Sequence, residues 1–507
     1  MNRPLHSTAA LFLVASGFLA GSFAADQPQW GEAWSRNMVS GERGLPATFD
    51  IATGRNVKWQ TEIGTEAYSS AIVASGRVYI GTNNGRPKDP KHDGDRGVLL
   101  CLEESSGRLL WQLVVPKRVE DIYFDWPNSG ICSPPTVEGD RVYVVDNRGE
   151  VLCLDALGLS NGNQGPFTNE AVRMAPKGTA PISPGPLDAD ILWRFDLTSG
   201  AGIWSHDAAH SSIVVGGNYL FLNSGTGVDN THRNIRTPDA PSLVVIDKRT
   251  GRLVARDGEA IAPNIFHATW SAPSMGRVNG QPRLFLAAGN GVVYGFDLPA
   301  EEALDRYSSR LPEAPPLRMG SAWRFDFDPE APKTNVHKYN SNRREGPSDF
   351  FGMPVFHGGR IYVAGGGDIW WGKTEAWIKC SPTEGGSAGR LVWSYPLRKH
   401  VLSTPAVADG LVFIADCGGV VHCLDAETGK ALWTGEIAGE AWASPMVADG
   451  KVYLGTRSGK FYVFALAREK KVLGVMDLGS PISGTVTAAN GTLYLATMRR
   501  LYALSGQ

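Results

Sequence analysis

The chain has 507 residues, of which 60 are glycine and only 20% are charged, and its 49 basic and 51 acidic side chains nearly cancel. A balance without basic or acidic blocks argues against nucleic acid or an anionic membrane as a partner, because both are bound mainly through clustered lysine and arginine. Abundant glycine among short apolar runs favours many tight turns between many strands, so we expect an all-β protein.

Residues 1–24 have the pattern of a signal peptide. Arg3 gives a positive start, an apolar run extends from Ala9 to Ala20, and Ser22-Phe23-Ala24 is the small-x-small pattern that signal peptidase accepts. The apolar run is too short to span a bilayer with ease, and no later run reaches about 18 apolar residues. We therefore expect a mature protein that starts near Ala25, has no transmembrane segment and is periplasmic or secreted.

The rest of the chain repeats one pattern. Its clearest copy runs from Ser403 to Trp433: a short apolar strand, an Asp-Gly turn, a β-branched strand, a third strand ending in Leu-Asp, and a glycine turn into a fourth strand that ends in Trp. Such a unit is a four-stranded meander. With Pro405 as the reference, the eight equivalent positions are Ala71, Pro135, Ile213, Pro273, Pro354, Pro405, Pro445 and Val486.

Eight units of this kind predict a closed ring. A unit of about 40 residues has the size of a propeller blade and cannot cover the faces of its own sheet. The last copy stops on its third strand, Leu501–Leu504, whereas 56–59, ahead of the first copy, has the sequence of a fourth strand. We therefore predict one domain over 56–507: an eight-bladed β-propeller of four-stranded antiparallel blades, closed by an N-terminal strand that completes the last blade. Residues 25–55 are expected to form an N-terminal wrapping segment.

The end of each unit carries a family resemblance. The stretch from Asp425 to Trp433, Asp-Ala-Glu-Thr-Gly-Lys-Ala-Leu-Trp, resembles the tryptophan-docking repeat of pyrroloquinoline-quinone-like (quinoprotein-type) propellers, in which a Trp packs beside a Gly of a neighbouring blade. The equivalent positions Ala255 and Leu473 depart from the pattern. The resemblance implies a structural docking role for Trp59, Trp111, Trp193, Trp323, Trp393 and Trp433.

Six cysteines in an exported protein suggest disulfides, but their positions argue against them. Cys101, Cys153 and Cys423 occupy one position in different units, and we expect them to lie well beyond the Cα separation of about 7 Å that a bridge allows. We expect small buried thiols instead. No group of residues has the spacing of a metal-ligand cluster, so the sequence predicts no metal site.

Insertions between the strands gather on one face of the predicted ring. The turns from first to second strands are tight, as at Asp409-Gly410, whereas several turns from second to third strands are long, as are the connections into units two to five. These longer segments share one face, while 157–190 and 298–321 form long third-to-fourth turns on the other. Loops longer than a connection needs are often functional. We therefore place a candidate ligand site on the first face, over the central funnel, and call it the looped face.

The candidate ligand-binding residues come from these loops and from the position three residues before each reference residue. They are Trp126, His206, Asp207, His210, His232, His267, Trp270, Asn342, Arg343, Arg344 and Trp442. At the equivalent position the ring reads Tyr68, Cys132, His210, Trp270, Phe351, Leu402, Trp442 and Ser483, which is typical of an aromatic girdle at the channel mouth or of bulky side chains wedged between inner strands.

Two constellations among these residues have alternative interpretations. His206 and Asp207 with His210 suit a general base held by a carboxylate, or a hydrogen-bond network that fastens a loop. The pair Arg343-Arg344 suits an anionic group, or it is solvated or paired with Glu345. No catalytic residue is assigned.

Three functions fit these features. The first, which the sequence favours, is an exported binding or scaffold propeller with a carbohydrate, peptide or protein ligand on the looped face. It resembles the outer-membrane assembly scaffolds built on this repeat, although the cysteine that carries their lipid anchor has no counterpart here.

The second function is a pyrroloquinoline-quinone-dependent oxidoreductase of alcohol or sugar dehydrogenase type, with quinone and calcium in the funnel. The resemblance implies two adjacent cysteines for such an enzyme, and no two cysteines are adjacent. The third is a polysaccharide-active hydrolase or lyase, for which no pair of carboxylates stands out.

Overall fold

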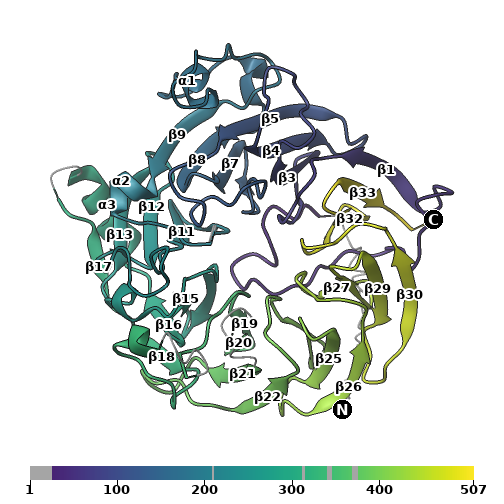
Figure 1. Ribbon diagram of the computed structural model, residues 1–507. Coiled ribbons are helices and arrows are strands. Elements are labelled where there is room, and N and C mark those ends of the chain that lie inside the picture. The colour runs from purple at the N-terminus through teal and green to yellow at the C-terminus, as the bar shows by residue number, and fades with distance from the viewer. Residues whose placement is uncertain (1–24, 208–210, 311–313, 340–344, 368–374, 507) are drawn as a thin grey trace, which may run out of the picture.

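The computed structural model describes residues 25–506 apart from 208–210, 311–313, 340–344 and 368–374. Eight sheets stand around one axis in chain order (Figure 1), so the predicted eight-bladed propeller is confirmed. The expected signal peptide, 1–24, lies outside the described residues. Within the described part of the chain, no helix has the length and apolar character needed to cross a membrane.

Each blade is an antiparallel meander whose first, short strand lies nearest the axis. Blade one has the strands β2 (Ile72–Ala74), β3 (Arg77–Asn83), β4 (Arg96–Glu103) and β5 (Leu109–Pro116), and blade two has β6 (Thr136–Glu138), β7 (Arg141–Val145), β8 (Glu150–Asp155) and β9 (Ile191–Asp196). Blade three has β10 (Val214–Gly216), β11 (Tyr219–Asn223), β12 (Leu243–Asp247) and β13 (Arg252–Asp257), and blade four has β14 (Ser274–Val278), β15 (Gln281–Ala288), β16 (Val292–Asp297) and β18 (Trp323–Asp326).

The remaining blades repeat the same order. Blade five has the strands β19 (Val355–His357), β20 (Arg360–Gly366), β21 (Ala376–Pro382) and β22 (Trp393–Leu397), and blade six has β23 (Ala406–Ala408), β24 (Leu411–Asp416), β25 (Val420–Asp425) and β26 (Ala431–Glu436). Blade seven has β27 (Met446–Ala448), β28 (Lys451–Gly455), β29 (Lys460–Ala465) and β30 (Val472–Asp477), and blade eight has β31 (Thr487–Ala489), β32 (Thr492–Ala496), β33 (Arg500–Leu504) and β1 (Val57–Glu62).

The ring closes where the two ends of the propeller meet. Strand β1 pairs antiparallel with β33, and Trp59 lies opposite Ala503 in the register. Closure by an N-terminal strand is therefore confirmed. It leaves every blade with two neighbours, so that no sheet face is left uncovered at a seam.

Short helices lie in the connections between the strands. They are η1 (Gly158–Asn161), α1 (Glu170–Met174), α2 (Leu197–Ala201), η2 (Ala262–Asn264), α3 (Glu301–Arg310) and η3 (Val336–Tyr339). The segment 298–321, predicted as a long turn, also contains α3 and a further strand, β17 (Leu317–Met319). Strand β17 pairs parallel with the outer strand β13, so the sheet of blade three has five strands. Strand β17 thereby covers the backbone groups at the outer edge of β13, which would otherwise be unpaired.

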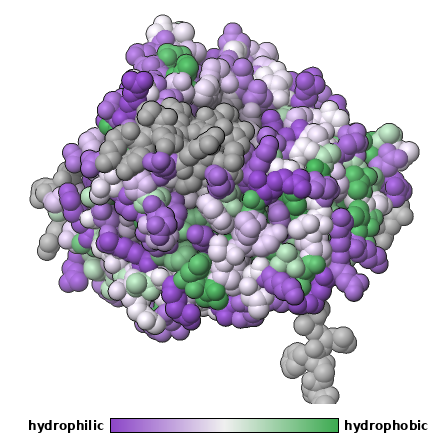
Figure 2. Space-filling model, turned by 60° about the horizontal axis from the view of Figure 1, so that its bottom comes forward, coloured by the Kyte–Doolittle hydropathy of each residue, from purple (hydrophilic) through white to green (hydrophobic). Residues whose placement is uncertain are grey.

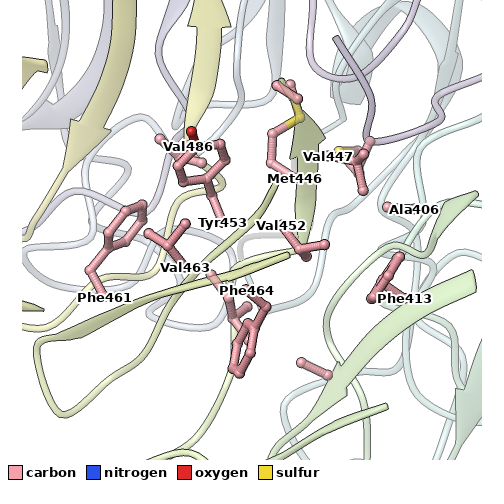
Figure 3. Close-up of a cluster of buried hydrophobic side chains, with 14 of the residues drawn as sticks. Ala406, Phe413, Met446, Val447, Val452, Tyr453, Phe461, Val463, Phe464 and Val486 are labelled. Carbon is pink, nitrogen blue, oxygen red and sulfur yellow. The ribbon is translucent and has the colours of Figure 1, made fainter. Parts of the chain in front are cut away.

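Apolar side chains of adjacent blades interdigitate and form the core. Figure 3 shows one such junction, where Phe413 of blade six and Met446, Val452 and Phe464 of blade seven belong to one buried cluster. Both faces of each blade are therefore buried, which explains why the inner strands read as continuous apolar runs.

The tryptophans of the docking motif lie at these junctions. The Trp393 indole donates to the carbonyl oxygen of Ala426 in the next blade at 3.0 Å, and a Cβ added to Gly429 would come within 2.5 Å of its ring. Four more indoles donate in the same way to the following blade, those of Trp59, Trp111, Trp193 and Trp433. The ring of Trp323 lies equally close to Gly389.

The cysteines form no disulfide, as predicted. All six are free; five are buried and Cys132 is half-buried. Burial raises the pKa of the Cys101 thiol to about 12, so this side chain is an inert apolar filler of its sheet.

The N-terminal segment contacts the inner strand of every blade. Its partners are the residues two positions after the reference position of each repeat: Val73, Val137, Val215, Met275, Phe356, Val407, Val447 and Ala488. They bond to residues between Gln27 and Ser40, and the purple trace of this segment crosses the middle of the ring in Figure 1. In most blades the contacted residue is the middle residue of the short inner strand, directly before the tight first-to-second turn, whose side of the ring is opposite the looped face.

A buried arginine holds this segment in place. The Arg36 guanidinium is fully buried and donates to the carbonyl oxygens of Trp30, Ser212 and Pro273 at 3.0–3.2 Å. Burial lowers its pKa to about 9. Residues 27–40, part of the expected N-terminal wrapping segment, thus bond to the inner strand of every blade. We call them the N-terminal plug.

Candidate functional site

The structure brings five of the predicted site residues together on the looped face. Trp126, His206, Asp207, His232 and His267 converge from four loops: the connections into blades two, three and four and the second-to-third turn of blade three. Four other candidates, His210, Asn342, Arg343 and Arg344, lie outside the described residues.

Three imidazoles form the centre of the site. Nε2 of His206 lies 3.1 Å from Nε2 of His232, and the ring centroid of His267 lies 5.0 Å from that of His206 and 5.3 Å from that of His232. One nitrogen of each ring lies within 4.8 Å of the others. His206 and His267 are buried and His232 is half-buried, so the cluster is accessible from the side of His232. We call it the imidazole cluster.

A carboxylate lies beside the cluster. Asp207 Oδ2 is 3.4 Å from Nε2 of His267, and Asp207 Oδ1 is 3.7 Å from Nε2 of His206. The exposed Trp126 indole donates to Oδ1 at 3.2 Å. Tyr123, from the same loop as Trp126, stacks on the His206 ring at 5.2 Å between centroids with an interplanar angle of 10°.

Burial changes the acidity of these groups. Burial, with a further contribution from the neighbouring His232, lowers the pKa of His206 to about 3. Burial also raises the pKa of Asp207 to about 6, although the hydrogen bond from Trp126 acts in the opposite direction. The His206 ring is therefore neutral near pH 7, with a nitrogen lone pair.

The backbone at the site is in an unusual conformation. Asp207 has φ 54° and His232 has φ 58°, in the left-handed region that residues with a Cβ seldom adopt. Strained backbone of this kind costs of order 1–3 kcal/mol and is concentrated at functional sites. The two residues lie on different loops, and Asp207 contacts two imidazoles of the cluster to which His232 belongs.

A buried carboxylate fixes the loops behind the cluster. Asp121 accepts hydrogen bonds from Trp204 Nε1 at 2.9 Å and from Asn230 Nδ2 at 3.0 Å, and it pairs with Arg236 at 2.6 Å. These three partners come from the two loops that carry His206 and His232. Asp121 thus connects the loop of blade two to both loops of blade three.

Side chains at the channel mouth lie in two separate groups. Trp270 stacks on Phe351 at 4.4 Å between centroids, and it also contacts His267 at 5.1 Å, so this pair adjoins the imidazole cluster. Trp442 instead stacks on Tyr68 at 6.2 Å, and the Arg457 guanidinium lies 4.5 Å above its ring. Trp442 is therefore not part of the cluster, although the sequence grouped it with Trp270.

The sequence analysis missed Tyr123 and Asp121 and expected no metal site. Nothing in the sequence around Tyr123 and Asp121 marks them out from other loop residues. The three histidines come from three separate loops, so no short spacing between ligands could have revealed them. The expectation of no metal site stays a prediction; the observed cluster offers three imidazole nitrogens, which are common ligands of zinc and copper.

The described donors do not suit the calcium ion of a quinoprotein site. Calcium takes six to eight oxygen ligands at 2.3–2.6 Å, whereas this cluster offers nitrogen and one carboxylate. Asp121 is already neutralised by Arg236, and Asp125, in the same loop, pairs with Lys117.

The comparisons with known proteins place the repeat in a class. A family model described as outer membrane protein assembly factor BamB matches residues 43–160 and 386–470. BamB from Moraxella catarrhalis is similar in structure, with a TM-score of 0.51 and 10% identity over 88% of this chain and 96% of that chain. The structure is therefore a β-propeller, and residues 43–160 and 386–470 are similar to pyrroloquinoline-quinone-like repeats.

Two further solved structures are similar to this chain. The computationally designed Ika8 protein has a TM-score of 0.50 and 10% identity over 89% of this chain and 99% of that chain. Quinohemoprotein alcohol dehydrogenase from Comamonas testosteroni has a TM-score of 0.46 and 13% identity over 95% and 81%. No curated protein matches the chain in sequence.

Proposed function

We propose that the protein is an exported binding propeller that holds a carbohydrate on the looped face of blades two to five. The observation that carries this proposal is the convergence of Trp126, Trp270 and the imidazole cluster from separate loops onto one face. The exposed ring of Trp126 and the half-buried ring of Trp270 offer apolar surface to a sugar ring, while imidazoles and a carboxylate can bond its hydroxyl groups. As an exported protein, it would meet such ligands in the periplasm or outside the cell.

The N-terminal plug supports a site with one entrance. Hydrogen bonds to all eight inner strands cover the opposite end of the channel, so a ligand would approach from the looped face. The face drawn in Figure 2 is largely hydrophilic, with hydrophobic residues in small patches.

A protein partner is a second candidate, because the matching family model describes an assembly factor. Its matched residues, 43–160 and 386–470, include the loop of Trp126 but leave out the loops that carry all three histidines. A scaffold function would thus depend on the common repeats, whereas carbohydrate binding would depend on the loops of blades two to five, most of which lie outside the matched residues.

A glycan array with the mature protein tests the proposal. We expect binding to a limited set of glycans, with Trp126→Ala and Trp270→Ala each reducing the signal at least tenfold. Phe167→Ala removes a half-buried aromatic ring from the long 157–190 loop on the other face and serves as the matched control. If the wild type binds no glycan, or if both tryptophan variants bind as the wild type does, the proposal is wrong.

A further inference from the structure

We propose that His206, His232 and His267 bind one divalent transition-metal ion, for which zinc is the best candidate. The proposal goes beyond the binding function argued above and does not depend on it. It rests on three imidazoles from three loops whose nitrogens lie within 4.8 Å of one another.

The spacing of the nitrogens is close to what a metal ion requires. Zinc binds imidazole nitrogen at about 2.0–2.1 Å in tetrahedral geometry, which places two ligand nitrogens roughly 3.3 Å apart. The Nε2 atoms of His206 and His232 lie 3.1 Å apart, so this pair is already at the required separation. The third imidazole, with its nitrogen within 4.8 Å of the others, would need to move by roughly 1.5 Å, within the range of a side-chain rotation.

The loops hold the ligands before any ion binds. The backbone nitrogen of His206 donates to Gly225 O at 3.1 Å, and His267 O accepts from Val228 N at 2.8 Å. These bonds join both connections to the second-to-third turn of blade three, which also carries His232. Because the ligand-bearing loops are already cross-linked, binding would cost little ordering entropy.

The surroundings supply charge and orientation. Asp207 places one carboxylate oxygen 3.4 Å from Nε2 of His267, where its negative charge would offset the charge of the cation. The Trp126 indole holds the other oxygen, as carboxylates near metal ions are commonly held. Tyr123 fixes the plane of the His206 ring by stacking on it.

The donor set predicts which ions bind. Imidazole suits zinc, copper and nickel, whereas calcium and magnesium prefer oxygen ligands. Three protein nitrogens leave at least one coordination position of a tetrahedral ion for Asp207, for water or for a ligand oxygen. The site would thus be selective for transition metals.

The test is a calorimetric titration of the metal-free mature protein with ZnCl2 and, separately, with CaCl2. We expect one zinc per chain, bound at micromolar concentration or tighter, and no binding of calcium. His232→Asn is the most informative variant, because asparagine tolerates the left-handed backbone at this position and lacks the imidazole. It should weaken zinc binding at least about 100-fold, and His206→Gln should do the same.

A control variant and a folding readout complete the experiment. His357→Ala removes an exposed histidine at the end of β19 and should leave zinc binding unchanged. Circular dichroism without metal shows whether each variant is folded. If His206→Gln is unfolded, the result for His232→Asn, at a half-buried position, is the one that tests the proposal. If the wild type does not bind zinc, or if folded His232→Asn binds it as the wild type does, the proposal is overturned. If the wild type binds zinc but no glycan, only the proposed function is contradicted.

Discussion

The side-chain amide of Asn37 exchanges two hydrogen bonds with the backbone of Val407: Nδ2 donates to the Val407 oxygen at 2.7 Å, and the Val407 nitrogen donates to Oδ1 at 2.8 Å. Both residues are buried. Val407 occupies in blade six the position that contacts the N-terminal plug in every blade. A single side chain thus satisfies both backbone groups of an inner strand residue, as a neighbouring strand would.

Replacing Asn37 should destabilise the propeller. Asn37→Ala leaves a buried donor and a buried acceptor of Val407 without these partners. Because each unpaired buried group costs about 1–3 kcal/mol, we expect the free energy of unfolding to fall by roughly 2–4 kcal/mol. Urea denaturation measures it, with Asn161→Ala, at an exposed position of η1, as the control. A loss below about 0.5 kcal/mol would show that the plug contributes little to stability.

The docking motif can be tested with a matched pair of glycines. Gly410 (φ 72°) and Gly429 (φ 68°) both have left-handed backbone, but a Cβ on Gly410 would meet nothing within 4 Å, whereas one on Gly429 would lie 2.5 Å from the Trp393 ring. Gly410→Ala should lower the free energy of unfolding by about 1–2 kcal/mol, from backbone strain alone. Gly429→Ala should lower it by the same amount and by about 1–3 kcal/mol more, because its Cβ overpacks against the ring.

Thermal or urea unfolding of the two glycine variants distinguishes these contributions. Equal destabilisation would mean that Trp393 moves aside without cost, and the docking role of the motif would then be unsupported.

The contribution of Asp121 to stability should depend on pH. Burial by itself would raise the pKa of this carboxyl, but the hydrogen bonds from Trp204, the Tyr123 nitrogen and Asn230, with the charge of Arg236, lower it below the usual value of 3.8. A depressed pKa in the folded state means that the stabilisation is fully present well above pH 4 and is lost as the pH falls through the folded-state value.

The matching experiment compares the wild type with Asp121→Asn from pH 3 to pH 7. We expect Asp121→Asn to be about 1.5–3 kcal/mol less stable at pH 7, since hydrogen bonds to a charged group are weakened, and the difference to shrink below about pH 4. A difference that stays constant down to pH 3 would rule out the ionised carboxylate as its cause.

The architecture could be predicted because each repeat carries its own local signals. Turn residues such as Asp409-Gly410, the apolar strands and the docking Trp393 recur at fixed positions, and the incomplete last repeat implied that β1 pairs with β33. The path of the N-terminal plug could not be predicted, because its bonds are made mostly by backbone atoms and by single polar side chains such as Asn37.

The candidate site was predicted in part for a related reason. Its histidines were selected because they lie in long loops, but their mutual contacts depend on how three loops fold over one another. No periodicity relates His206, His232 and His267, so their convergence could only be seen in three dimensions. Strand β17 was missed likewise, because a three-residue edge strand is held by its partner β13 and not by its own sequence.

We infer that the long loops of the looped face together form one site around the imidazole cluster. The most direct measurement is an anomalous difference map from crystals of the mature protein grown with zinc, collected above and below the zinc absorption edge. We expect one strong peak about 2.1 Å from a nitrogen of each of His206, His232 and His267. Well-ordered imidazoles with no peak between them, or a peak bound elsewhere on the chain, would contradict this inference.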